Sequence, residues 1–237
     1  MQPVLEMNTP DGFGLWPVAE TERFSFLPLS GELSPAEIGT ALMRIAACND
    51  VDPADFGGLP PRPAEPLSGF LHGLLNLDNL YAAGGLCVTD NSTGITFSPG
   101  CCDGLEDWHD WHHVADGSGM IGYGHDPQSS LAERLGDTVR LTVDTDRNGP
   151  VFELSATQLR RLLAGAERDL TEFLAAATDW ISEHLPDHST RLTAALARLL
   201  ALPAPGTPPT PPGTAGRDYR HAHGLDARRT WLGQLHS

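Results

Sequence analysis

Apolar residues recur at helical spacing in two long stretches of the chain. In the longer one, 156–184, they keep a single stripe, as expected of a helix that buries one face. Ser155 and Gln158 stand at its start with the spacing of a capping box, in which side chains and first-turn amides bond reciprocally. Ser34 and Glu37 have the same spacing and predict a second helix that runs to residue 48.

Two shorter apolar stretches predict further helices. The stretch "LSGFLHGLLNLDNLYAAGG" (67–85) predicts a short helix that ends at a pair of glycines. After residue 184 the sequence "LPDH" interrupts the long helix, and "STRLTAALARLLAL" (189–202) again has apolar residues on one side. The sequence therefore predicts a pair of helices toward its C-terminal end.

Between these helices the pattern changes to short β-rich segments. Segments 86–89 and 94–98 flank a turn made of Asp, Asn, Ser, Thr and Gly, which is typical of a β-hairpin. Segments 131–135 and 138–144 flank a Gly-Asp turn, and 151–155 follows as another strand. Strands joined by short turns, with helices on either side, predict an α+β domain with a small antiparallel sheet packed against amphipathic helices.

A change of composition after residue 202 predicts three parts. Residues 1–202 form the α+β domain, 203–216 ("PAPGTPPTPPGTAG") form a proline-rich linker, and 217–237 form an arginine- and histidine-rich tail. Within the tail a short helix is predicted from Asp226. The tail either docks on its own acidic domain, which a high effective concentration favours, or meets a partner.

Charge is distributed unevenly along the chain, which contains no lysine. Residues 1–150 contain 22 acidic residues and 6 arginines, whereas 151–237 contain 9 of each. The segment 48–130, called the acidic segment below, contains 12 acidic residues and one arginine. Such a field repels nucleic acid and anionic lipid and favours a basic protein partner, although it also serves plain solubility.

The first residues and the cysteines bear on the compartment. The start of the chain, "MQPVLEMNTPDGFGLW", lacks the basic and apolar regions of a signal peptide, and no apolar run is long enough to span a bilayer. The four cysteines show no C-x-x-C spacing. We therefore expect a cytoplasmic protein with reduced thiols, and the lack of lysine is typical of a GC-rich bacterial genome.

The stretch "SPGCCDGLEDWHDWHH" (98–113) concentrates most of the candidate chemistry. Asp103 is placed to cap a helix over 104–114. On that helix Leu105, Trp108 and Trp111 share an apolar arc that can anchor the segment in the core. The histidines and acidic residues then lie on its other faces.

One hypothesis for this stretch is a zinc site formed by Cys101, Cys102, His109 and His113. The two histidines are four residues apart, which lets both imidazoles face one cation, and a preceding cysteine can add a thiolate. "HDWHH" also resembles the metalloprotease pattern H-E-x-x-H with aspartate in place of the glutamate base. His125 and Glu133 are the candidates for a third ligand. The alternative is a structural helix whose acidic residues complement its dipole.

Two functions follow from these patterns. The first is a non-enzymatic acidic binding protein that acts on a basic protein partner, with Glu106, Asp107 and Asp110 as partner-binding residues. In architecture and charge this is similar to small bacterial immunity or inhibitor proteins, with which no motif is shared. The alternative is a zinc-binding protein or metal-dependent hydrolase centred on 101–113. No G-x-G-x-x-G, Walker or G-x-S-x-G pattern is present, so the sequence identifies no nucleotide cofactor and no catalytic residue.

Overall fold

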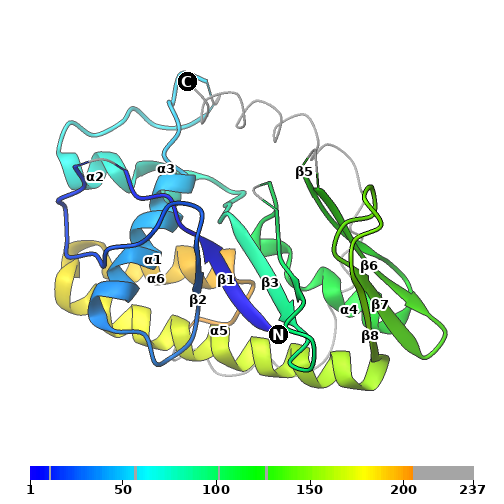
Figure 1. Ribbon diagram of the computed structural model, residues 1–237. Helices are drawn as coiled ribbons and strands as arrows, with labels where there is room; N and C mark the ends of the chain where they lie inside the picture. Colours follow the sequence, from blue (N-terminus) through cyan, green and yellow to red (C-terminus); the bar gives the residue numbers. More distant parts are fainter. Residues whose placement is uncertain (11, 56–57, 101, 126–127, 205–237) are drawn as a thin grey trace. The chain divides into compact units, whose positions relative to one another are not determined.

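The long helix predicted after Ser155 is α5 (Ala156–His184), and the other elements are arranged around it (Figure 1). The capping box of Ser155 and Gln158 is present at its start. α5 contacts β1, β7, β8, α1, α4 and α6. Its buried stripe consists of Leu159, Leu163, Ala166, Leu170, Phe173, Leu174, Ala177, Trp180 and Ile181.

The computed structural model describes residues 1–10, 12–55, 58–100, 102–125 and 128–204 and confirms the α+β class. It contains two four-stranded antiparallel sheets. The first has the order β2-β1-β3-β4. Its strands are β1 (Gln2–Glu6), β2 (Phe26–Pro28), β3 (Gly84–Thr89) and β4 (Thr96–Phe97). The pairing of β3 with β4 confirms the predicted hairpin.

The second sheet is a meander in chain order, β5-β6-β7-β8. Its strands are β5 (Ile121–His125), β6 (Gln128–Leu135), β7 (Thr138–Thr142) and β8 (Val151–Ser155). Side chains alternate between two faces along each strand. Ala132, Val139 and Leu141 are fully buried on the inner face, which packs against α4 and α5. The intervening positions form the outer face.

The remaining helices differ in how well the sequence predicted them. The helix predicted over 34–48 is α1 (Pro35–Cys48), with its capping box formed, and the one predicted from 189 is α6 (Ser189–Leu199), preceded by η2 (Pro186–His188). The single helix predicted over 67–85 is wrong. It divides at Leu71 into α2 (Pro66–Phe70) and α3 (His72–Asn76).

Tertiary contacts determine the path of the second part of this segment. Gly73 lies so close to α1 that a Cβ there would fall 1.7 Å from the Asn49 carbonyl oxygen. Beyond α3 the chain turns extended, because the Asn49 side chain bonds both the backbone amide and the carbonyl of Tyr81. The backbone at Ala83 then pairs with Glu6 of β1. Tertiary hydrogen bonds therefore outweigh the helical pattern of this segment.

Three strands were not predicted from the sequence. β1 lies between two neighbours, and four of its five residues are buried, so it lacks the alternation that reveals a half-exposed strand. β2 is only three residues long. β5 includes Gly122 and Gly124, which indicated a loop, but register places both on the outer face of the second sheet. The predicted linker and tail lie almost wholly outside the described residues and stay predictions.

No helix in the described part of the chain is both long and apolar enough to cross a membrane.

The cap of α5 gives a stability prediction. Ser155→Ala removes the hydroxyl that accepts a hydrogen bond from the Gln158 amide, and we expect it to lower the free energy of unfolding by about 1 kcal/mol. Urea denaturation measures this change. Ser189→Ala is the matched control, because α6 has no side-chain cap. If both substitutions lowered the free energy of unfolding equally, Ser155 would not be the residue that caps α5.

Candidate functional site

The segment after Cys102 is helical, but it is not the single α-helix that was predicted. It consists of a 3₁₀ turn, η1 (Leu105–Asp107), followed by α4 (Asp110–Asp116). The predicted cap is also wrong: the Asp103 carboxylate accepts a hydrogen bond from the Gly100 amide at 2.6 Å, and η1 begins after Gly104 without a side-chain cap. Asp103 therefore holds the preceding turn and not the helix.

The tight winding places the apolar residues in line. The amide of Trp108 bonds the Leu105 carbonyl and that of Trp111 bonds the Trp108 carbonyl, which is 3₁₀ bonding, so residues three apart are superposed. Leu105, Trp108, Trp111 and Val114 are all at most 1% exposed. The Trp108 indole N–H donates to the Leu200 carbonyl and that of Trp111 donates to the Tyr123 hydroxyl. The prediction that this stretch anchors the segment in the core is confirmed.

The histidines of the segment lie at its surface. The ring of His109 rests against Trp108, with centroids 3.7 Å apart, and its histidine neighbour is His112 at 6.0 Å. The His113 Nδ1 lies 3.2 Å from the Ser118 hydroxyl. Burial, the charge of His112 and, in the opposite direction, the charge of Glu167 leave the pKa of His109 below its ordinary value.

The zinc hypothesis has no group of ligands in the described part of the chain. No three His, Cys, Asp or Glu side chains there are placed to hold one metal ion. Cys102 is half-buried, and Cys101 lies outside the described residues. The zinc site of Cys101, Cys102, His109 and His113 therefore stays a prediction.

The structure describes the side chain of only one of the two candidate third ligands of the zinc site. Glu133 lies on the outer face of β6, whereas α4 packs on the inner face of that strand. The sheet therefore separates Glu133 from the histidines of α4. His125 belongs to β5, and its side chain lies outside the described part.

The three predicted partner-binding acids differ in exposure. Glu106 is half-buried and its carboxylate accepts a hydrogen bond from the Ala82 amide at 3.1 Å, which ties η1 to the end of the first sheet. Asp107 is half-buried and Asp110 is exposed. Glu106 thus has a structural contact that the sequence did not reveal, and the partner-binding role of all three stays a prediction.

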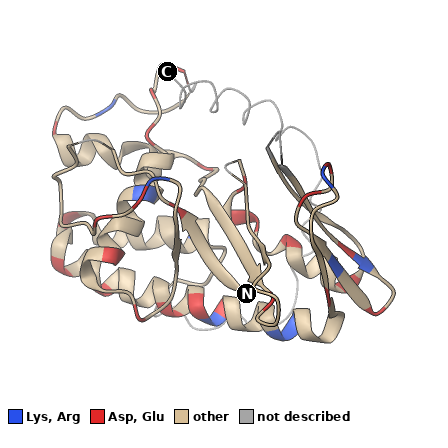
Figure 2. Cartoon of the chain, viewed as in Figure 1, with Lys and Arg blue, Asp and Glu red and all other residues tan. Residues whose placement is uncertain are grey.

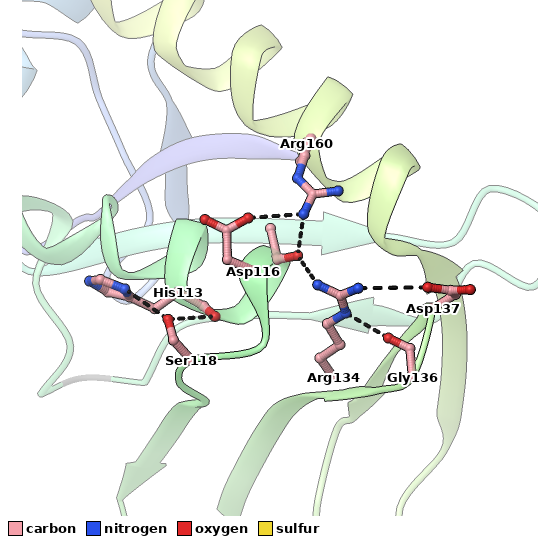
Figure 3. A network of polar contacts seen from close by, with 8 residues as sticks. His113, Asp116, Ser118, Arg134, Gly136, Asp137 and Arg160 are labelled. Carbon is pink, nitrogen blue, oxygen red and sulfur yellow. Dashed lines mark hydrogen bonds and ion pairs between the residues drawn. The ribbon is translucent and has the colours of Figure 1, made fainter.

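Two arginines converge on the C-terminal end of α4 (Figure 3). Arg134 from β6 and Arg160 from α5 both donate to the Ala115 carbonyl, at 2.7 and 2.9 Å. Arg160 also bonds Asp116 at 2.9 Å, which lowers the pKa of that carboxyl. Cations at this end complement the helix dipole, so the network fixes α4 to α5 and to the second sheet.

A hollow of about 500 Å³ lies on the outer face of the second sheet. Sequence reasoning missed it, although the alternation along 131–135, 138–142 and 151–155 is the signal that predicts one polar face. We call it the sheet hollow. It is lined by strand residues of β6, β7 and β8 and by part of the loop that follows β7: Leu131, Glu133, Arg140, Thr142, Asp144, Thr145, Asn148, Gly149, Val151 and Glu153.

The loop beside the sheet hollow has a spacing of oxygen-bearing residues that also went unnoticed. Asp144, Asp146 and Asn148 precede Gly149, as in the first half of a calcium-binding loop, but Ser155 occupies the position of the closing glutamate. The Oδ1 atom of Asp144 accepts hydrogen bonds from the backbone amides of Asp146 and Arg147. These internal bonds shape the loop, and the described residues provide no cluster of three ligands around it.

Comparison of the chain with protein-family models, with curated proteins and with solved structures finds no match in any of the three.

The surroundings of His109 give a pH prediction. A pKa below the ordinary 6.5 means that the folded protein binds fewer protons than the unfolded chain just below that pH. The contribution of His109 to stability is therefore complete above about pH 6.5 and falls as the pH drops through the folded-state pKa. Histidine NMR titration should show a pKa for His109 that rises in His112→Asn and falls in Glu167→Gln. A wild-type pKa of 6.5 or higher would contradict this.

His72 gives a second stability prediction. It is 2% exposed, and neither ring nitrogen has a hydrogen-bond partner among the residues that the structure describes. Burying unsatisfied polar atoms is costly, so we expect His72→Leu to raise the free energy of unfolding by about 1 kcal/mol. Chemical denaturation tests this, with the exposed His113→Leu as control. A clear loss of stability in His72→Leu would show that its imidazole has a favourable interaction.

Proposed function

We propose that this chain is a non-enzymatic acidic binding protein whose partner is a basic protein, in the manner of an inhibitor or immunity protein. The observation that supports the proposal is the state of the only arginine in the acidic segment. Arg62 is bound to the Asp50 carboxylate and donates to the carbonyls of Val51 and Gly69. This arginine is therefore held locally and offsets the charge of Asp50, so the segment, with 12 acidic residues and one arginine, keeps a net negative charge.

Two arginines from other elements, both of which contact the end of α4, are also engaged. Arg134 and Arg160 are held by the Ala115 carbonyl and by Asp137 and Asp116. Figure 2 shows acidic positions over helices and loops with few basic positions among them. The summed negative field accelerates the approach of a cationic protein and disfavours anionic partners.

Capture from a lysate of the native host tests the proposal. We expect the immobilised full chain to retain a basic protein at low salt and to release it between about 0.1 and 0.5 M salt, because exposed charges are then screened. Mass spectrometry identifies the retained protein, and calorimetry with the purified partner then measures the dissociation constant.

Two variants with equal charge change sharpen this test. One neutralises four acids of the acidic segment: Asp52→Asn, Asp55→Asn, Asp107→Asn and Asp110→Asn. The other neutralises four acids of the C-terminal helices: Glu172→Gln, Asp179→Asn, Glu183→Gln and Asp187→Asn. Only the first should weaken binding by more than about tenfold. Equal weakening, or no retained basic protein at low salt, would count against the proposal.

A further inference from the structure

The geometry points to the sheet hollow as a second contact surface, separate from the acidic segment. It receives one arginine- or lysine-bearing segment of the basic partner, while the acidic segment contacts the body of that partner, so the inference rests on the proposed function. The hollow lies outside the acidic segment, and no sequence motif indicated it. Three properties of the described residues support it: an open sheet face, a hollow of sufficient volume and a negative charge.

The outer face of the second sheet is open to solvent. Along β7, Val139 and Leu141 are buried, whereas Arg140 and Thr142 between them are partly exposed. Val151 on β8 keeps 48% of its surface exposed. The helices that pack on this sheet lie against its inner face, so its outer side chains are accessible.

The hollow is a shallow, open depression with room for long side chains. Its volume of about 500 Å³ falls within the range of ligand pockets. On the β5 side the residue paired with Leu131 is Gly122, and a Cβ built there meets nothing within 4 Å. An extended segment can therefore approach from the β5 side without meeting a side chain at Gly122.

The net charge of the hollow favours a cationic occupant. Strand register places Arg140 between Glu133 on one neighbour and Glu153 on the other. Arg140 bonds Glu153 at 3.0 Å, and Asp144 adds a third carboxylate to the lining. Three carboxylates against one guanidinium give a net negative site that complements a cation and repels phosphate.

The apolar part of the lining favours a side chain over a small ion. Leu131 and Val151 lie among the charged residues. Arginine and lysine have an apolar stem with a charged end, so the stem can cover these residues while the end reaches a carboxylate. A basic protein segment satisfies both parts of the hollow.

A peptide titration tests the inference. The probe is a fluorescently labelled eight-residue peptide of alternating arginine and valine, and a glutamine–valine peptide is the uncharged control. We expect the full chain to bind only the arginine peptide, measured by anisotropy at low salt. Glu133→Gln/Glu153→Gln should weaken binding about tenfold, whereas Asp107→Asn/Asp110→Asn, with the same charge change, should alter it less than twofold.

A variant that is expected to bind the peptide more tightly serves as a control for folding, because an unfolded protein would bind it less. Arg140→Gln removes the only cation among the strand residues of the hollow and should tighten binding severalfold. Unchanged affinity in Glu133→Gln/Glu153→Gln, or weaker binding in Arg140→Gln, would overturn the docking site. The proposed function would survive that result if the host partner is still captured, whereas failure to capture any basic partner would remove both.

Discussion

Packing of the apolar stripe of α5 against both sheets is the interaction on which the rest of the structure depends. A helix of 29 residues is about 43 Å long, enough to contact β1 of the first sheet as well as β7 and β8 of the second. The same helix also contacts α1, α4 and α6. Since α5 and α4 pack on the inner face of the second sheet, no helix of the described residues covers its outer face, which is the surface that we propose for docking.

Three arginines of the described part of the chain have the same structural use. Arg62, Arg134 and Arg160 each bond at least one backbone carbonyl as well as a carboxylate. These guanidiniums connect segments of the fold and are held locally. The protein therefore combines internal cross-links made by these three arginines with a net negative charge, and the proposed function follows from this combination.

Elements defined by local signals were predictable, and elements defined by tertiary contacts were not. α1 and α5 have a capping box and a long apolar stripe, and both signals lie within one segment. The 67–85 segment has a helical pattern as well, but Asn49, distant in sequence, draws its second half into extended backbone. β1 was missed because a strand buried between neighbours has no alternation to detect.

The candidate site shows the same limit. The tryptophans of 98–113 were correctly expected to anchor the segment, since large apolar side chains at helical spacing seek the core. Its 3₁₀ winding and the turn-holding role of Asp103 depend on backbone bonds that residue types do not specify. Likewise, Glu133, Arg140 and Glu153 become neighbours only once the register of three strands is known.

The central claim is that the sheet hollow binds a basic segment of the partner. Its most direct test is an NMR map of amide shifts in the full ¹⁵N-labelled chain titrated with the arginine–valine peptide. The account predicts that the largest amide shifts fall on the outer-face positions of β6, β7 and β8 and on loop residues 144–149, with the glutamine–valine peptide causing none. Shifts confined to η1 and α4, or spread evenly over all acidic surfaces, would contradict it.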